Sequence, residues 1–139
     1  MKFLHTMLRV HDLEKSLHFF TEILGLKVKK KTDYPDGQFT LVFLESEGSD
    51  AQIELTHNWD SDEVLEGGRN FGHIAFEVDN IYETCQRLMD QGVVINRPPR
   101  DGRMAFAKTP DGISLEFLQK GGALEILAPW KDMPNTGSW

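Results

Sequence analysis

Hydrophobic and polar positions along the chain follow the same order twice. One stretch begins at Leu4 and reads LHTMLRVHDLEKSLHFFTEILGLKV, and the other begins at Gly72 and reads GHIAFEVDNIYETCQRLMDQGVVI. In both, a short apolar segment with a His near its start precedes an Asp or Asn, an amphipathic run and a closing Gly. A shift of 68 positions places His5 on His73. Self-similarity over this distance indicates two copies of one structural unit.

The amphipathic run in each copy predicts a helix. Each run follows a residue that suits an N-cap, Asp12 in the first copy and Asp79 or Asn80 in the second. The Gly that closes each run is a typical helix stop. We therefore expect helices over 13–24 and 81–91. The apolar residues at helical spacing are Leu13, Leu17, Phe20 and Leu24 in the first run and Ile81, Cys85, Leu88 and Met89 in the second.

Turn signals after each helix predict three further strands. The strands separated by these turns include QFTLVFLE and RMAFAKT, and a short strand with one Glu between two apolar residues, IEL in the first copy and LEF in the second. The turns are Asp36-Gly37 and EGSD at 47–50 in the first copy, and Asp101-Gly102 and Pro110-Asp111-Gly112 in the second. A strand at 26–31 and its equivalent at 93–97 precede the first turn of each copy.

The order of elements in each copy is therefore strand, helix, strand, strand, strand. This order predicts an α+β fold of two βαβββ modules. We expect the modules at 1–58 and 70–118, a linker at 59–69 and a tail at 119–139. The polar linker contains Gly, and the tail contains Pro and Trp outside the repeat.

Composition and charge favour one small globular domain. The chain has 139 residues, of which 40% are hydrophobic and 27% charged, and its formal net charge is −7. An acidic chain without a long apolar run is not expected to bind nucleic acid or a membrane. The single cysteine, Cys85, cannot form an intrachain disulfide, which favours a reducing compartment such as the cytoplasm.

Each copy carries one His and one Glu on a strand face directed away from its helix. Alternate residues of a strand face opposite sides of the sheet, so His5 and Glu54 lie opposite their apolar neighbours. His73 and Glu116 hold the matching positions in the second copy. A pseudo-twofold relation between the copies brings all four side chains to one cleft.

A divalent cation explains such a cluster. A single His or Glu on a strand is more often structural, but four buried ionisable groups around one cleft need compensation. Neutral imidazole and carboxylate suit Zn, Ni, Co, Fe or Mn, and the lack of thiolate ligands disfavours a closed structural zinc site. The predicted metal ligands are His5, Glu54, His73 and Glu116.

Four segments resemble the glyoxalase I family of the vicinal oxygen chelate superfamily. They are FLHTMLRV with its following helix, QIELTHNW, FGHIAFEV and PDGISLEFL, and the resemblance covers about residues 1–118. It implies a single domain of paired βαβββ modules, with a curved mixed sheet around a metal cleft. Each module gives one His and one Glu to the metal site. In the family this site usually lies across a homodimer interface. The family's four ligands fall on the same four residues as the repeat predicts.

The resemblance implies isomerisation of the hemithioacetal of methylglyoxal and glutathione to S-lactoylglutathione, through an enediolate. A metal ion can stabilise charge on the two adjacent oxygens, and a nearby carboxylate can move the proton between the carbons. Glu116 is implied as the principal base, and Glu54 as its symmetric partner. The short spacing around His73 resembles the class activated by nickel or cobalt, with zinc as the alternative.

The glutathione part of this substrate carries two carboxylates and needs cationic and amide partners. By strand parity, Arg9 shares the His5 face and Asn58 shares the Glu54 face. Both match glutathione-binding positions of the family, and Arg69 and Arg103 match further basic positions less closely. The tail matches no part of the family pattern, so packing across a dimer, shielding of the cleft and mobility are all open.

Other functions within the same fold are also open. An epimerase shares the enolate chemistry and all four ligands, whereas a dioxygenase of this superfamily uses two His and one carboxylate. A metal-free binding module needs no such ligands. The complete set of four argues against the last two, and Arg9 and Asn58 argue against the epimerase.

We expect no catalytic role for His18, His57 or Cys85. We expect His18 to be exposed on the first helix and His57 to face away from the cleft. Cys85 is expected to pack in the helix core. Phe3 and Met7 share the His5 face, where substrate contact and core packing are both open.

Overall fold

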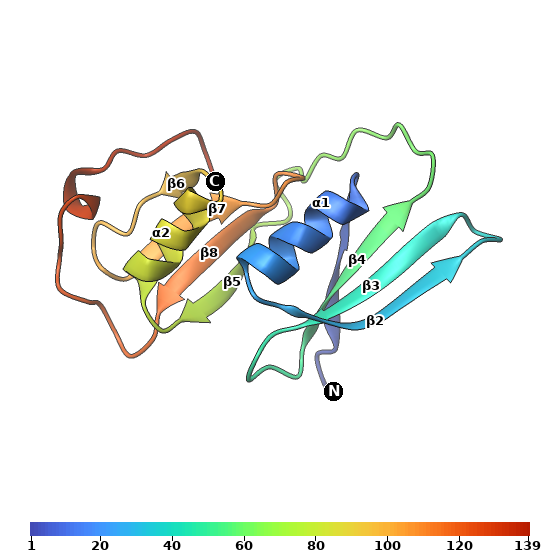
Figure 1. Ribbon diagram of the computed structural model, residues 1–139, viewed down its shortest axis with the longest axis horizontal. Helices are drawn as coiled ribbons and strands as arrows, with labels where there is room; N and C mark the ends of the chain where they lie inside the picture. Colours follow the sequence, from blue (N-terminus) through green and yellow to red (C-terminus); the bar gives the residue numbers. More distant parts are fainter. The chain divides into compact units, whose positions relative to one another are not determined.

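Each copy of the repeat folds into its own four-stranded mixed sheet with a helix over one face (Figure 1). The computed structural model describes residues 1–139 and divides into two units, Met1–Glu66 and Gly67–Trp139. The α+β fold and the order strand, helix, strand, strand, strand are confirmed in both.

The first unit has the strand order β1-β4-β3-β2. Strands β1 and β4 are parallel, and β3 pairs antiparallel with both β4 and β2. The parallel pair places the first and last strands of the module side by side. The elements are β1 (His5–Arg9), α1 (Leu13–His18), a π-helical turn (Phe19–Ile23), β2 (Lys27–Tyr34), β3 (Phe39–Glu45) and β4 (Gln52–Asn58).

The second unit repeats this topology, in the order β5-β8-β7-β6. Strands β5 and β8 are parallel, and β7 pairs antiparallel with β8 and β6. The expected strand before the first turn is present in both units, longer than predicted in β2 and shorter in β6. The elements are β5 (His73–Val78), α2 (Ile81–Asp90), β6 (Ile95–Arg97), β7 (Met104–Lys108), β8 (Ser114–Gln119) and a 3-10 turn (Trp130–Asp132).

The helical segment of the first unit begins as predicted but does not keep one regular period. The Asp12 side chain caps α1 by accepting a hydrogen bond of 3.0 Å from the Lys15 amide. After His18 the chain turns with π geometry, and the amide of Leu24 donates to the carbonyl of Phe19. Buried positions recur at i, i+3, i+4 and i+7 from Ser16, so the contact face is rotated away from Leu13 and Leu17. The predicted apolar stripe is therefore wrong in part: the most buried residues are Ser16, Phe19, Phe20 and Ile23, while Leu13, Leu17 and Leu24 are only half-buried.

Helix α2 agrees with its sequence pattern except at one position. The Asn80 side chain caps it, accepting hydrogen bonds from the amides of Tyr82 and Glu83. Ile81, Cys85 and Leu88 are buried, as predicted. Met89 was expected on the same face but is exposed, because it lies one residue past Leu88 and a step of 100° carries it out of the contact stripe.

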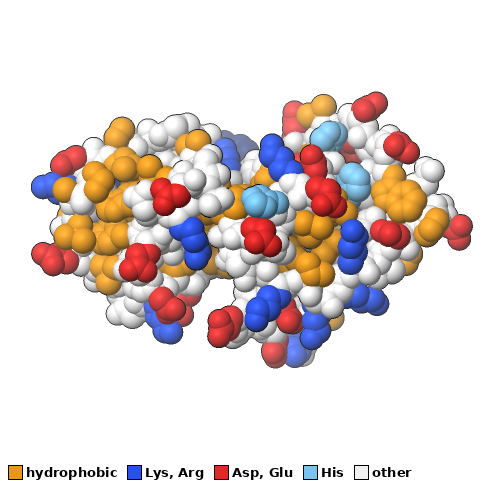
Figure 2. Space-filling view, viewed as in Figure 1, with side chains coloured by type: hydrophobic (Ala, Val, Ile, Leu, Met, Phe, Trp, Pro, Cys, Tyr) orange, Lys and Arg blue, Asp and Glu red, His pale blue; other side chains and the backbone are white.

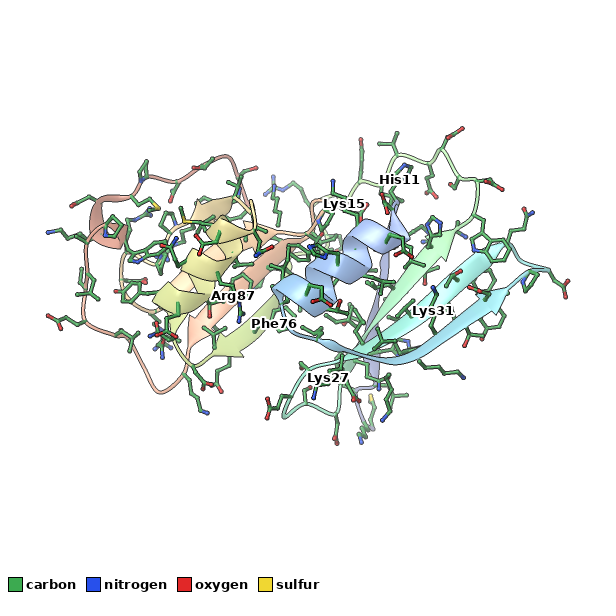
Figure 3. All side chains as sticks on the ribbon, viewed as in Figure 1. His11, Lys15, Lys27, Lys31, Phe76 and Arg87 are labelled. Atoms are coloured by element: carbon green, nitrogen blue, oxygen red, sulfur yellow. The ribbon has the colours of Figure 1, made fainter.

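The core of each unit lies between its helix and one face of its sheet. In the first unit Leu8, Val42 and Leu55 are buried there, and in the second Ala105, Leu115 and Phe117 are buried. Figure 3 labels Lys15 on α1 and Arg87 on α2, and both side chains are exposed. The opposite face of each sheet is therefore free to carry functional side chains.

Residues after β8 pack onto the second unit. The amide of Leu124 donates to the Gly102 carbonyl at 2.9 Å, and the Tyr82 hydroxyl donates to the Glu125 carbonyl at 2.7 Å. Trp130 is buried and stacks on the Tyr82 ring. The segment that lacks a counterpart in the first copy is thus part of the second unit.

On the face that Figure 2 shows, charged groups of both signs are interspersed with apolar ones in each unit. Lysines are frequent on β2, where Figure 3 labels Lys27 and Lys31. Such charges on an edge strand disfavour pairing with further strands. Neither α1 nor α2 is long and apolar enough to cross a membrane.

Candidate metal centre and substrate contacts

In the first unit, His5 and Glu54 meet on the sheet face opposite the helix. The parallel register pairs His5 with Gln52 and Met7 with Glu54, so the two side chains are diagonal neighbours on adjacent strands. Nε2 of His5 lies 2.9 Å from Oε2 of Glu54. The imidazole is 39% exposed and the carboxylate 13%, so an imidazole nitrogen and a carboxylate oxygen converge on an open surface.

In the second unit, His73 and Glu116 repeat this arrangement. The register pairs His73 with Ser114 and Ala75 with Glu116, which is the same diagonal relation. Nε2 of His73 lies 3.0 Å from Oε2 of Glu116, with exposed fractions of 43% and 14%. The agreement between the pairs in distance, burial and register shows that the repeat preserves a local site.

A phenylalanine completes each pair, and the sequence did not single it out. Phe43 on β3 lies directly opposite Glu54 on β4, and its ring meets His5 edge to face at 5.5 Å between centroids. Phe106 on β7 lies opposite Glu116 and meets His73 at 5.3 Å. The available signal was parity, because both Phe residues share a sheet face with the Glu across from them. Each edge contact favours the observed orientation of its histidine ring.

The donor set of each pair suits a divalent cation. Neither unit gathers three or more His, Cys, Asp or Glu side chains. Each presents one imidazole nitrogen and one carboxylate oxygen, a set that borderline divalent metals accept. Two donors leave most of a coordination shell unfilled, so one pair alone is half of such a site.

Arg9 and Asn58 also lie together. Both follow the first pair by four residues along their strands, and Nε of Arg9 donates a hydrogen bond of 2.9 Å to Oδ1 of Asn58. The contact uses one of the five N–H groups of the guanidinium and leaves both terminal nitrogens available. The structure thus joins two residues that the sequence placed on one face separately.

The other two basic candidates are both in the second unit but differ in surroundings. Arg69 is exposed and lines a cavity of about 620 Å³ that also includes His73 and Lys108. Arg103 is exposed beside β7, and its backbone amide donates to Oδ1 of Asp101. The cavity therefore connects Arg69, but not Arg103, with a predicted metal ligand.

Three further residues, His18, His57 and Cys85, lie as the sequence predicts. His18 is exposed at the end of α1, and Nδ1 of His57 lies 3.3 Å from the Val10 carbonyl. Cys85 is fully buried in α2, and burial raises the pKa of its thiol to about 12. Phe3 and Met7 are both exposed, so neither packs in the core of its unit.

Comparison with known proteins identifies the family. Residues 2–117 match the model of the Glyoxalase/Bleomycin resistance protein/Dioxygenase superfamily. The lactoylglutathione lyase of Neisseria meningitidis serogroup A is 47% identical over 127 residues, which cover 86% of this chain and 91% of the relative. The lactoylglutathione lyase of Haemophilus influenzae is 41% identical over 126 residues, covering 86% and 93%.

A solved structure agrees with these relatives. The trypanothione-dependent glyoxalase I of Leishmania major superimposes with a TM-score of 0.80 at 38% identity, covering 86% of this chain and 87% of that one. Its fold matches the two repeated modules described above. The chain belongs to the Glyoxalase/Bleomycin resistance protein/Dioxygenase superfamily.

Proposed function

We propose that the chain is a metal-dependent lactoylglutathione lyase. It isomerises the hemithioacetal of methylglyoxal and glutathione to S-lactoylglutathione and so removes methylglyoxal. The observation that carries this proposal is the repeated His–Glu pair, present with nearly equal distances in both units. Relatives of 41% and 47% identity with this activity in their names support it.

His5, Glu54, His73 and Glu116 would hold the metal, two from each unit. When bound, a divalent cation supplies electrostatic stabilisation for negative charge on two adjacent substrate oxygens. Nickel or cobalt is the proposed ion, with zinc as the alternative. The imidazole nitrogen and carboxylate oxygen donors suit all three ions.

Glu116 moves the proton that the isomerisation requires. Its carboxylate takes the proton from the carbon that carries sulfur, which leaves an enediolate, and returns it to the neighbouring carbon. The hydroxyl proton passes between the two oxygens, so the product differs from the substrate only in the positions of two hydrogens. Glu54 is the symmetric carboxylate and serves the opposite enantiomer of the hemithioacetal.

Arg9 and Asn58 hold the thiol part of the substrate. The guanidinium can give two parallel hydrogen bonds to a carboxylate while Nε stays on Asn58. The amide nitrogen of Asn58 is a further donor. Arg69 and Arg103 supply positive charge for the second carboxylate of glutathione.

The site is completed in a homodimer. Each unit offers two ligands, and pairing the first unit of one chain with the second unit of another yields two equivalent sites. The cytoplasm suits this function because its reducing conditions maintain the free thiol from which the hemithioacetal forms.

A thioester-formation assay on metal-stripped protein tests the proposed function. Ni, Co, Zn, Mn and Mg are added back in turn, and S-lactoylglutathione is followed in the ultraviolet. We expect no activity without metal and recovery with Ni or Co. Absence of isomerase activity with every metal, while an acyl or sugar epimerisation is catalysed, would support the epimerase alternative. Equal rates with adducts of other thiols would contradict the specificity for glutathione but not the isomerisation.

A further inference from the structure

Trp139 lies beside the second His–Glu pair, although it is distant from that pair in the sequence. Its ring stacks on Phe106, with 5.9 Å between centroids and 27° between planes. Phe106 in turn meets His73 edge to face. A continuous run of rings therefore extends from the predicted metal ligand to Trp139.

The segment before Trp139 is fixed along its length by the body of the second unit. Nη1 of Arg100 donates to the Met133 carbonyl at 2.9 Å and to Oδ1 of Asn135 at 2.8 Å. Asn96 and Thr136 exchange two hydrogen bonds of 2.8 Å, one through the backbone and one through the Asn96 side chain. These hydrogen bonds hold Met133, Asn135 and Thr136, and so position the chain that leads to Trp139.

Trp139 forms one wall of the cavity of about 620 Å³ that contains His73. The apolar part of the wall is formed by Phe71, Phe106, Ile113 and Trp139. The polar part includes Arg69, Lys108 and Ser114, whose buried hydroxyl has no hydrogen-bond partner, and no Asp or Glu lines the cavity. A ligand suited to this cavity combines an apolar group with oxygen atoms or negative charge.

We propose that Trp139 is a specificity-determining residue that packs against the carbon substituent of the 2-oxoaldehyde. This inference rests on the proposed function. The hemithioacetal carries two groups on its reacting carbons, an apolar substituent from the aldehyde and a charged tripeptide from the thiol. The rings begin at the ligand His73 and extend away from it, so the apolar substituent is the group that meets them.

The stacked Trp also makes the two halves of the site unequal. Phe43 and Phe106 occupy equivalent places beside His5 and His73, but Trp139 stacks only on Phe106. A large substituent gains more from contact with the indole when it is directed toward the second unit. An aromatic substituent gains most, because pairs of rings interact beyond the area they bury.

Kinetics with two substrates test this role. Wild type, Trp139→Ala and Trp139→Phe are compared on the glutathione adducts of methylglyoxal and phenylglyoxal. In Trp139→Ala we expect the ratio of kcat/KM for the phenyl over the methyl adduct to fall about two- to tenfold, the range of one ring pair. Trp139→Phe keeps most of the ratio. An unchanged or increased ratio in Trp139→Ala would overturn the proposal.

Tyr34→Ala is the matched control. Tyr34 stacks on Phe39 in the first unit and is 40% exposed, close to the 43% of Trp139. Its removal leaves the substrate ratio unchanged. If Tyr34→Ala lowers the ratio as much as Trp139→Ala does, the effect is a general loss of ring packing and the proposal is wrong.

Binding measurements separate this inference from the proposed function. In the Glu116→Gln background, calorimetry compares S-mandeloylglutathione with S-lactoylglutathione, and Trp139→Ala should weaken only the former. Wild type that turns over neither adduct contradicts the proposed function itself. Wild type that turns over both, with equal effects of Trp139→Ala on both products, contradicts only the role of Trp139.

Discussion

The side chains of Arg9 and Asn58 form a hydrogen bond of 2.9 Å across 49 residues of chain, from Nε to Oδ1. Each lies at the end of its strand, and β1 and β4 are parallel neighbours. The bond orients the guanidinium and leaves its two terminal nitrogens for one carboxylate. Orientation before binding reduces the entropy lost when the carboxylate binds.

Replacing Arg9 should therefore weaken binding of the thiol part of the substrate. For Arg9→Ala we expect a higher KM and a loss in kcat/KM of about tenfold or more, since a charged hydrogen bond contributes about 1.5–3 kcal/mol. Arg9→Lys recovers only part of this, because an ammonium lacks the planar fork. Steady-state kinetics on the glutathione adduct provide the measurement.

Arg87→Ala, on the exposed face of α2, is the control for removing one positive charge. It should leave KM unchanged. With an adduct in which the carboxylate bound by Arg9 is replaced by an amide, Arg9→Ala should raise KM less. An equal rise in KM with this adduct would show that Arg9 does not bind that carboxylate.

The two histidines should be equally necessary for metal binding. His5→Ala and His73→Ala each remove one of the proposed donors, so both should lose bound metal together with activity. Elemental analysis after dialysis measures the metal, and His18→Ala, an exposed histidine on α1, should retain it. Full metal content in either ligand variant would remove that His–Glu pair from the site.

Much of this site could be predicted because strand parity and repetition are local properties. Strand parity placed His5 and Glu54 on the sheet face directed away from the helix, and the βαβββ order is legible in the pattern of turns. The same parity identified the face of Arg9 and Asn58. The hydrogen bond between them required the register itself, which the sequence did not provide.

Other features depended on packing between distant segments. The helical run of the first unit ends in a π turn at Phe19–Ile23, which the spacing of apolar residues did not predict. In the sequence, Phe43 and Phe106 are not distinguished from other apolar strand residues, because their edge contacts with the histidines depend on the folded structure. Trp139 had no counterpart in the repeat, so only its hydrogen-bonded path across the second unit places it beside Phe106.

The two carboxylates should differ in their contribution to turnover. Glu116→Gln keeps an oxygen ligand but removes the base, so metal should largely remain while kcat falls by orders of magnitude. Glu54→Gln should lose less. Turnover of each enantiomer of the hemithioacetal, followed together with metal content, distinguishes the two. Near-normal turnover by Glu116→Gln would assign the base to Glu54.

The position of the chain after β8 should depend on the absence of a side chain at Gly102. This residue has φ +68°, and an added Cβ would lie 2.3 Å from the Leu124 carbonyl oxygen. Gly102→Ala should therefore displace the segment that leads to Trp139, lower stability by roughly 1–3 kcal/mol and lower the phenyl-to-methyl ratio. Urea unfolding and the two-substrate assay measure both.

Gly121→Ala separates backbone strain from the clash. Gly121 has φ +74° but open space around its Cβ position. It should lose some stability and keep the substrate ratio. Loss of the ratio in Gly121→Ala, or its retention in a folded Gly102→Ala, would contradict the path proposed for this segment.

The buried thiol of Cys85 should make stability fall at alkaline pH. Burial raises the pKa of the thiol from 9.0 to about 12, so between these values the unfolded chain ionises and the folded chain does not. The contribution is fully present below pH 9 and is lost as pH rises toward 12. The unfolding free energy of wild type should therefore approach that of Cys85→Ala over this range. A constant difference between pH 8 and 11 in urea unfolding would refute it.

We expect one His–Glu pair from each of two chains to form one active site. Mixing inactive His5→Ala with inactive Glu116→Gln tests it, after subunit exchange is verified by mass spectrometry. A mixed dimer then has one doubly damaged site and one intact site. We expect activity to return and to approach half of the wild-type value per mixed dimer. No recovery despite complete exchange would contradict it and assign both pairs of a site to one chain.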